Sequence, residues 1–258
     1  MKAIILAAGK GSRLRPYTDK LPKCMVEIAG KPIIHHQLKT LAKVGIKDIT
    51  VVGGYQSDKI TGDFHRVQNH NFETTNMVSS LFCAKNCIND SEDLLIIYGD
   101  IIYEPSMISN LISSQAPIAL SIDRDWMRLW SVRMEDPLVD VETLKLRDGK
   151  LVVEIGKKPQ SLDEVQGQYV GLIKVRAEYI NDMYNSWLNL DRHEVFDGQS
   201  FDNIYMTSFL QHLIDSGWTV EASFTSGGWI EVDTESDLKI YNEMWHQNRL
   251  DDLIKLHD

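Results

Sequence analysis

The sequence has few cysteines and no long apolar run, and both shortages limit what the protein can be. Cys24, Cys83 and Cys87 are an odd number without the paired spacing of a disulfide framework, so we expect a reducing compartment. Cys83 and Cys87 share one face of a predicted helix without a Cys-x-x-Cys motif or flanking histidine, which favours a buried pair of thiols over a metal site. The N-terminal apolar run ends at Gly9, too soon for a signal peptide, and no run is long enough to span a bilayer. These absences predict a cytoplasmic protein that is not embedded in a membrane.

Positive charge is also scarce over the whole chain. Lys and Arg total 27 against 37 Asp and Glu, which gives a net charge of −10 and argues against a nucleic-acid partner. A small anionic ligand would therefore need a local basic pocket in an acidic body. The N-terminus provides such a cluster, made of Lys10, Arg13, Arg15, Lys20 and Lys23.

Apolar runs alternate with helical spacings along the 258 residues, and the 43% hydrophobic content is ordinary for a globular protein. This alternation predicts a single α/β domain of Rossmann-like type over residues 1–258, with a mixed, mostly parallel sheet flanked by helices. The expected strands are Lys2–Ala7, Asp48–Val52, Asp93–Tyr98, Ile118–Ile122 and Tyr169–Val175. The expected helices are Pro32–Val44, one that begins within Tyr55–Asp63, Met77–Cys87, Asn203–Asp215 and Glu235–Leu256.

The pattern changes between Trp126 and Val153, where short alternating segments surround a turn at Asp148-Gly149. Period-two alternation with a turn of this kind predicts antiparallel strands. We therefore expect an inserted β-rich section over about residues 124–160 that forms one wall of a pocket.

Two glycines, Gly9 and Gly11, directly follow the first predicted strand. Glycines at this position let backbone N–H groups turn toward phosphate oxygens without a Cβ in the way. The dinucleotide-binding signature needs a third glycine, which is missing, and no Gly-Lys-Ser/Thr follows at the spacing of the common phosphate-binding loop. A redox dinucleotide-binding protein is therefore disfavoured. A tight turn beside a solvated basic face is the alternative, but the cluster lies at the carboxyl end of a strand, where α/β sheets bind ligands.

The segment from Leu6 to Pro32 resembles the opening signature of the sugar-nucleotide pyrophosphorylase and cytidylyltransferase superfamily. That signature runs Leu-Ala-Ala-Gly-x-Gly-x-Arg-Leu-x-Pro, then Pro-Lys, then Gly-Lys-Pro. Every fixed element is present, at Leu6–Gly9, Gly11, Arg13, Leu14, Pro16, Pro22, Lys23 and Gly30–Pro32. The resemblance implies a nucleotidyltransferase.

The resemblance also implies a role for the residues of this segment. In the family the loop binds a nucleoside triphosphate, and the arginine and lysine of the signature, here Arg13 and Lys23, neutralise its charge. The expected nucleotide-binding residues are then Leu6, Ala8, Gly9, Lys10, Gly11 and Ser12, together with Gly99 at a later strand end.

Three carboxylates are candidates for a metal site. Asp100 ends a predicted buried strand, and Glu231 and Asp233 alternate along a later one that resembles the family's metal-binding acidic pair. Taken alone, Gly-Asp after a strand fits a turn, and Asp233 could simply cap the last helix. A triphosphate changes this balance, because Mg²⁺ is bound by one or two carboxylates together with phosphate oxygens. We therefore expect Mg²⁺ at Asp100 and Asp233, with Glu231 as a third candidate ligand.

A further resemblance lies at Glu154–Pro159 and the following Tyr169–Gly171, which are similar to the family's Glu-Lys-Pro segment and glycine strand. In the family a lysine there contacts the phosphate of the acceptor, which implies this role for Lys158. Lys157 stands where the family usually has an acid, so which of the two lysines points inward stays open.

The implied reaction is attack by an acceptor phosphate oxygen on the α-phosphorus of the nucleotide, with release of pyrophosphate. The nucleophile is already anionic at neutral pH, so no general base is required. Catalysis then rests on positioning and on charge neutralisation.

The nucleotide is suggested by a departure from the sugar-specific branch. Sugar-1-phosphate members usually have a Pro-Gly-Thr-Ala segment before the strand that ends in the metal-binding aspartate. This chain instead has the run NHNFETTNMVSSL at Asn69–Leu81, which resembles the branch that uses CTP with phosphocholine, related phospho-alcohols or phosphonates. Amide and hydroxyl groups can bond a pyrimidine edge, so Asn76 and Ser80 are the expected base contacts. An N-capped helix start without a ligand explains either residue equally well.

The acceptor and the oligomeric state, a homo-oligomer included, stay open at this point. A sugar-1-phosphate nucleotidyltransferase using dTTP, UTP or GTP and a non-catalytic nucleotide-sensing module remain alternatives. A trimethylammonium acceptor would favour an aromatic cage, whereas a zwitterionic or phospho-amino acceptor would need fixed charges. Candidates for the cage are Trp126, Trp130, Tyr169, Trp187 and Trp229, and candidates for the charges are Arg124, Arg128 and Arg133.

Overall fold

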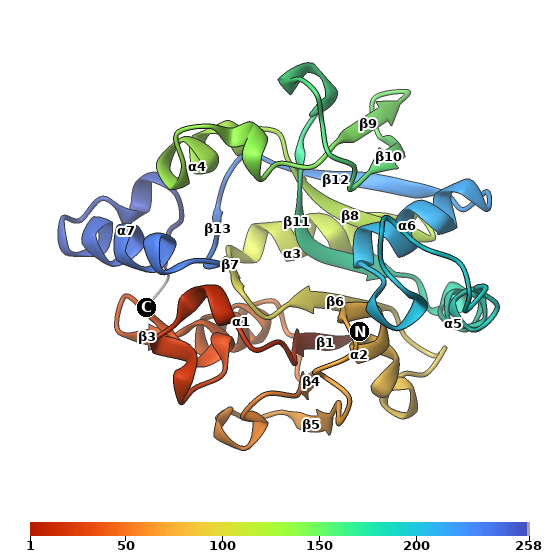
Figure 1. The fold of residues 1–258 in the computed structure, drawn as a ribbon, viewed down its shortest axis with the longest axis horizontal. Helices are drawn as coiled ribbons and strands as arrows, with labels where there is room; N and C mark the ends of the chain where they lie inside the picture. The colour runs from red at the N-terminus through yellow and green to blue at the C-terminus, as the bar shows by residue number, and fades with distance from the viewer. Residues whose placement is uncertain (257–258) are drawn as a thin grey trace.

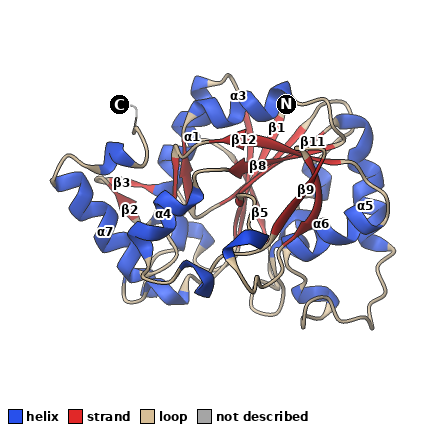
Figure 2. Cartoon of the chain, turned by 90° about the horizontal axis from the view of Figure 1, so that it is seen from above, coloured by secondary structure: helices blue, strands red, loops and turns tan. Residues whose placement is uncertain are grey.

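The computed structural model describes residues 1–256, and within them nine strands form one mixed sheet with helices on both faces (Figures 1 and 2). The strand order is β5-β4-β1-β6-β11-β8-β12-β10-β9. The strands are β1 (Lys2–Ala7), β4 (Asp48–Gly53), β5 (His65–Gln68), β6 (Leu94–Tyr98), β8 (Ile118–Asp123), β9 (Leu144–Arg147), β10 (Leu151–Ile155), β11 (Gln168–Val175) and β12 (Val220–Thr225). Two small pairs accompany the sheet, β2 (Glu27–Ile28) with β3 (Lys31–Pro32) and β7 (Ile101–Tyr103) with β13 (Trp229–Glu231).

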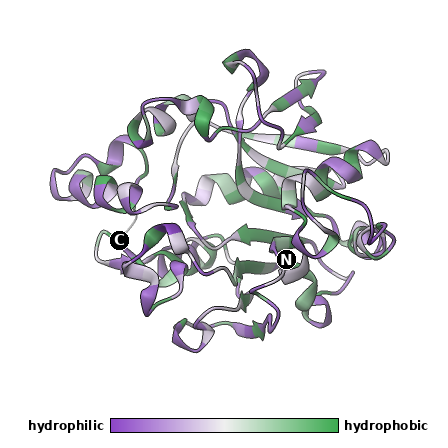
Figure 3. Cartoon of the chain, viewed as in Figure 1, coloured by the Kyte–Doolittle hydropathy of each residue, from purple (hydrophilic) through white to green (hydrophobic). Residues whose placement is uncertain are grey.

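The helices divide between the two faces of the sheet, as the alternation of side chains in the strands requires. In β1, Ala3 and Ile5 belong to one buried cluster, and Ile4 and Leu6 belong to the other. In Figure 3 the central strands are accordingly hydrophobic, and much of the outer chain is hydrophilic. The helices are α1 (Ile33–Lys43), α2 (Met77–Cys83), α3 (Pro105–Ser113), α4 (Trp126–Arg133), α5 (Ile180–Leu188), α6 (Met206–Asp215) and α7 (Glu235–His246).

The topology brings distant segments to one edge of the sheet. β1 pairs in parallel with β4 and β6, so the loop after Ala7 and the turn at Gly99-Asp100 leave the sheet at the same end. β13 pairs antiparallel with β7, and the Val232 N–H donates to the Asp100 carbonyl at 2.9 Å. This pairing places Asp233 beside Asp100, although they are far apart in the chain. The predicted α/β fold with a mixed, mostly parallel sheet is confirmed.

Two of the predicted helices differ from the structure. Tyr55–Asp63 holds only a 3₁₀ turn at Ser57–Lys59, and β5 follows it, because the Arg66 guanidinium binds carbonyl oxygens of this segment, including that of Ile60 at 2.5 Å. The helix predicted over Met77–Cys87 ends at Cys83, and a 3₁₀ turn follows.

The ends of these elements also correct two smaller predictions. Cys83 is exposed and Cys87 is half-buried, so the predicted buried pair of thiols is wrong. The last helix ends at His246 rather than near Leu256. Two residues after His246, Asn248 adopts a left-handed conformation with φ +55°, which ends the helix.

The section predicted as a β-rich insertion begins with a helix. α4 covers Trp126–Arg133, where Trp126, Leu129, Trp130 and Arg133 are buried at helical spacing. The β9–β10 hairpin matches the prediction, with its turn at Asp148 and Gly149 in left-handed backbone conformations. β10 pairs with β12, so the hairpin extends the main sheet. No helix in residues 1–256 combines the length and apolar character that crossing a membrane requires.

Candidate active site

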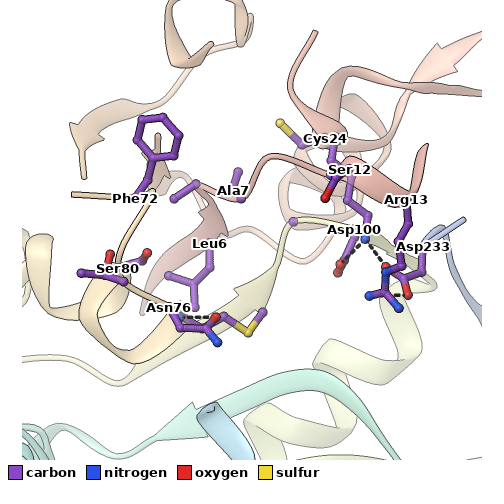
Figure 4. A pocket seen from close by; sticks show the side chains of 17 residues that line it. Leu6, Ala7, Ser12, Arg13, Cys24, Phe72, Asn76, Ser80, Asp100 and Asp233 are labelled. Atoms are coloured by element: carbon purple, nitrogen blue, oxygen red, sulfur yellow. Dashed lines mark hydrogen bonds and ion pairs between the residues drawn. The ribbon is translucent and has the colours of Figure 1, made fainter. Parts of the chain in front are cut away.

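A cavity of about 310 Å³ lies at the carboxyl ends of β1 and β6, and we call it the first cavity. Figure 4 shows Phe72, Asn76 and Ser80 on one side of it and Arg13, Asp100 and Asp233 on the other. The sequence-predicted residues that the structure gathers around this cavity are Leu6, Ala8, Gly9, Gly11, Ser12, Arg13, Lys23, Asn76, Ser80, Gly99, Asp100 and Asp233.

The two loop glycines have different physical reasons to be glycine. Gly11 has φ +59°, and a Cβ there would lie 2.9 Å from the Lys23 Cβ. A side chain at this position would therefore meet both an unfavourable backbone conformation and a steric clash. The Thr18 hydroxyl also fixes this turn by donating to the Gly11 carbonyl at 2.7 Å. At Gly9 no atom lies within 4 Å of the place that a Cβ would take. Gly11 therefore shapes the loop, and Gly9 leaves its inner face open to a ligand.

Lys23 joins the two acidic residues of the first cavity. Its Nζ lies 2.7 Å from Asp100 Oδ2 and 2.8 Å from Asp233 Oδ1, and the Arg13 Nη2 lies 2.7 Å from Asp233 Oδ2. Burial lowers the pKa of Lys23, but attraction to Asp100 and Asp233 outweighs burial and raises it above the usual value. Burial also acts to raise the pKa of Asp233, and Lys23 and Arg13 hold it below the usual value. Asp100 and Asp233 are thus both in direct contact with the Lys23 ammonium group.

Asp100 and Asp233 fit a divalent cation. Asp100 Oδ1 is buried and has no hydrogen-bond partner among the described residues, while one oxygen of each aspartate contacts the Lys23 ammonium. Such an arrangement of carboxylate oxygens around one positive charge suits a divalent cation. Asp233 is held by a bond from its N–H to Asp237 Oδ2 at 3.0 Å, and Thr234 caps α7. The alternative that Asp233 only caps the last helix is therefore wrong.

Glu231 does not join this pair as a third ligand. Its Oε2 lies 2.8 Å from the Arg133 Nη1, and it faces a different cavity. In residues 1–256 no group of three His, Cys, Asp or Glu side chains gathers to hold a metal ion. Burial, together with Asp100 and Asp233, raises the pKa of Glu231.

A second cavity, of about 220 Å³, adjoins the first and shares Arg13, Met77 and Asp233 with it. Its wall combines aromatic rings with carboxylates, and β11, β13 and α4 contribute to it. Among its lining residues are Tyr98, Trp130, Asp140, Glu142, Tyr169, Trp229 and Glu231.

Of the five aromatic residues predicted as cage candidates, the second cavity uses Trp130, Tyr169 and Trp229. Trp126 instead packs against Trp130 with ring centroids 5.9 Å apart. Trp187 stacks on Phe82 and Phe201 in another part of the core. These two tryptophans serve the packing of the fold.

The two lysines predicted to reach the acceptor lie outside both cavities. The Lys158 ammonium donates to the carbonyls of Leu138 and Val139, and Lys157 lies 2.5 Å from Asp197 Oδ1. Both ammonium groups are occupied by local partners in the loops that surround the hairpin. The structure therefore does not bring Lys158 to the place that the resemblance implied.

Lys10 also lies outside the lining of the first cavity. Its Nζ pairs with Glu73 Oε1 at 2.7 Å and lies 5.9 Å from the centre of the Phe72 ring. This ion pair connects the glycine loop to the segment before α2. Lys10 thus ties together two sides of the first cavity.

The predicted base contacts already have partners of their own. Asn76 caps α2 by accepting from the Met77 N–H at 2.8 Å, and Ser80 accepts from the Asn69 side chain at 3.0 Å. Both still line the first cavity, so the capping role and a ligand role coexist at Asn76.

Sequence reasoning missed Phe72 and Glu142. Phe72 places an aromatic ring in the wall of the first cavity, and the signal for it was an aromatic residue within the polar run Asn69–Leu81. Glu142 is a single acid in an irregular segment, and no local pattern marked it. Burial raises the pKa of Cys24, which also lines the first cavity, to about 12, so this residue remains a thiol.

Comparisons with known proteins show which family the chain belongs to. Residues 3–144 match the family model described as the MobA-like NTP transferase domain. The chain is 41% identical over 253 residues to the CTP:phosphoglutamine cytidylyltransferase of Campylobacter jejuni, covering 94% of this chain and 100% of that protein.

Two solved structures share the fold at lower sequence identity. The inositol-1-phosphate CTP transferase from T. maritima superposes with a TM-score of 0.72 at 22% identity, over 98% of this chain and 97% of that one. The CTP:phosphocholine cytidylyltransferase from Streptococcus pneumoniae gives a TM-score of 0.66 at 21% identity, over 94% and 98%. The chain thus belongs to the MobA-like NTP transferase family and is a nucleotidyltransferase.

Proposed function

We propose that this protein transfers a cytidylyl group from CTP to a small phosphorylated or phosphonate acceptor and releases pyrophosphate. The observation that supports this most directly is the junction of the two cavities at Arg13 and Asp233. A transfer reaction needs two substrates to meet at one charged centre, and a nucleotide-sensing module needs only the first cavity. The full-length similarity to a CTP-dependent enzyme supports CTP as the donor.

The reaction needs positioning and charge neutralisation from the protein. An oxygen of the acceptor phosphate forms a bond to the α-phosphorus, and the bond from the α-phosphorus to the bridging oxygen breaks, so pyrophosphate leaves with that electron pair. Arg13 and Lys23 neutralise the triphosphate, and the open face of Gly9 admits it. No proton has to be removed from the nucleophile.

Asp100 and Asp233 would hold a Mg²⁺ ion beside the triphosphate. When bound there, Mg²⁺ offsets the negative charge of the phosphates. Lys23 then exchanges its carboxylate partners for phosphate oxygens, which its flexible stem allows. The same proposal places the reaction in the cytoplasm, where a reducing environment keeps the thiols of Cys24, Cys83 and Cys87 free.

CTP is preferred over the nucleotides of the sugar-specific branch for a local reason. Asn76 and Ser80 of the run Asn69–Leu81 lie in the first cavity, opposite the metal-binding aspartates (Figure 4). An amide and a hydroxyl there can satisfy the edge of a pyrimidine, and Phe72 offers a face for stacking. The proline-glycine segment of the sugar-specific branch is absent from this run.

The test is pyrophosphate release from CTP, UTP, dTTP and GTP with Mg²⁺ and a panel of acceptors. The panel holds phosphocholine, 2-aminoethylphosphonate, phosphoglutamine and glucose-1-phosphate. We expect release with CTP and a non-sugar acceptor, and a loss of about 10²-fold or more in Asp100→Ala, because one metal ligand is removed. Asp58→Ala, at an exposed position outside both cavities, is the matched control. Preference for dTTP, UTP or GTP with glucose-1-phosphate would refute the proposal.

A further inference from the structure

We propose that the acceptor has an ammonium group at the end opposite its phosphate, and that Glu142 in the second cavity binds this group. This inference rests on the proposed function, which leaves the chemical class of the acceptor open. Glu142 then becomes the residue that sets acceptor specificity. The argument starts from the charges of the cavity wall.

The Glu142 carboxylate has no ion-pair or hydrogen-bond partner in the part of the chain that the structure describes, and it lines the second cavity. Its backbone, in contrast, is fixed on both sides by Gln168. The Gln168 amide donates to the Glu142 carbonyl at 2.8 Å, and the Glu142 N–H donates to the Gln168 Oε1 at 3.4 Å. Glu142 therefore holds a positioned carboxyl group that lacks a partner.

The other three carboxylates of the cavity are already engaged. Asp140 accepts from the Trp130 indole N–H at 3.2 Å. Glu231 is paired with Arg133, and Asp233 with Lys23 and Arg13. The only basic side chain that lines the cavity within residues 1–256 is Arg13, and it lies at the junction with the first cavity. Positive charge is thus present at the junction, where the phosphate arrives, and Glu142 is the carboxyl group of this cavity that has no partner among the described residues.

The aromatic wall suits the same kind of ligand. Tyr98 and Tyr169 form a T-shaped pair with ring centroids 5.7 Å apart, and both line the cavity beside Trp130. Aromatic faces attract ammonium groups through their quadrupole. The two tyrosine hydroxyls lie close enough to interact with each other, so the pair presents its rings to the cavity as one unit. Rings and a free carboxylate together match an alkylammonium rather than a neutral polyol.

The raised pKa of Glu142 in the free protein also favours a bound cation. Burial, aided by Asp140 and Asp197, raises the pKa of Glu142 to about 7. A half-buried carboxylate without a partner is poorly solvated, and a bound cation offsets that cost. Binding of an ammonium group would therefore be favoured by an existing electrostatic strain in the free protein.

The arginines do not offer an equally good site for an acidic acceptor. Arg124 lies over the Phe224 ring at 3.5 Å, outside the cavity, and Arg128 pairs with Asp125. Arg133 is buried and is bonded to Glu231 and Asp237. The positive end of the acceptor is therefore the end that the second cavity recognises. A quaternary and a primary ammonium share this chemistry, and the experiment separates them.

The experiment compares charged acceptors with neutral isosteres in the wild-type protein. Phosphocholine is paired with 3,3-dimethylbutyl phosphate, and phosphoethanolamine with n-propyl phosphate. Binding is measured by calorimetry with Mg²⁺ and a non-hydrolysable CTP analogue, and turnover is measured by pyrophosphate release. We expect at least one of the two ammonium compounds to bind about 10-fold or more tightly than its own isostere. The better of the two ammonium compounds identifies the acceptor class.

Glu142→Gln keeps the shape of the side chain and removes its charge. In this variant we expect the preference for the ammonium compound to fall to about 3-fold or less, with affinity for the CTP analogue unchanged. Glu194→Gln, an exposed acid outside both cavities, should keep the wild-type preference. Thermal unfolding checks that the variants are folded, and the isostere comparison needs no variant.

Two results would overturn the inference: equal binding of isosteres and ammonium compounds by the wild type, or an unchanged preference in Glu142→Gln. These results leave the proposed function intact if pyrophosphate is still released from CTP. Selective binding of ammonium compounds without pyrophosphate release from CTP would instead support the inference and refute the proposed function.

Discussion

The two cavities of this protein share a boundary but are built in different ways. The first takes most of its wall from short stretches of the N-terminal third, and its two carboxylates face Lys23 and Arg13 directly. The second takes most of its wall from scattered segments after Tyr98, and its Glu142 carboxyl group has no partner among the described residues. The comparison teaches that one cavity can be built from stretches that are local in the sequence. The cavity beside it is assembled from scattered positions.

Lys23→Met tests the charge balance of the first cavity and should have the largest effect. The substitution leaves Asp100 and Asp233 facing each other without their shared cation, and it removes a neutralising group from the triphosphate. We expect a loss of turnover of about 10²- to 10³-fold. Without metal the melting temperature should fall, and added Mg²⁺ should raise it more than in the wild type, because the ion replaces the missing charge.

Lys20→Met, an exposed neighbour outside the first cavity, should change neither property. Thermal unfolding with and without Mg²⁺ measures the stability, and pyrophosphate release measures the turnover. If Mg²⁺ raises the melting temperature of Lys23→Met no more than that of the wild type, Lys23 does not balance the charge of the two aspartates.

Glu142→Gln tests the unpaired charge of the second cavity through stability instead of binding. The pKa of Glu142 is raised to about 7 in the folded protein from an ordinary value of 4.5, so the folded state holds an extra proton between these pH values. Wild-type stability therefore falls as pH rises through this window, and the variant lacks this loss. The full change in pKa corresponds to about 3 kcal/mol, and because the side chain is only half-buried we expect the variant to be more stable by about 1–2 kcal/mol at pH 8, with the difference vanishing below about pH 4.

Urea unfolding of both proteins from pH 4.5 to pH 8 gives this difference directly. Because other groups titrate equally in both proteins, their contributions cancel. A difference that stays constant with pH would show that the Glu142 carboxylate is not unpaired.

Gly11→Ala and Gly9→Ala test the glycine loop with a matched pair and should have the smallest effects on stability. At Gly11 the positive φ and the Lys23 Cβ at 2.9 Å both oppose a side chain, so the free energy of unfolding should fall by about 1–2 kcal/mol. At Gly9 a Cβ meets no atom within 4 Å, so stability should change by less than about 0.5 kcal/mol. Urea unfolding measures both variants, and equal losses would contradict the division of roles within the loop.

The sequence predictions were accurate for features that neighbouring residues encode and less accurate for features that depend on distant contacts. Lys2–Ala7 and its glycine loop were predicted because a buried strand and a phosphate loop are both encoded in neighbouring residues. The helix at Trp126–Arg133 was missed, because tryptophans and arginines in a short segment do not separate period two from period 3.6. Lys158 was assigned by resemblance, yet nearby carbonyls at Leu138 and Val139 take its ammonium group.

By itself, the sequence determined the α/β fold and marked the glycine loop and the two aspartates that line the first cavity, because each depends on a contiguous pattern of residues. Only the tertiary structure decided which distant groups meet. The pairing of β13 with β7 brings Asp233 to Asp100, and the packing of α4 and β11 leaves Glu142 without a counter-ion in the second cavity. Such meetings depend on the summed packing of the whole chain, and no stretch of neighbouring residues specifies them.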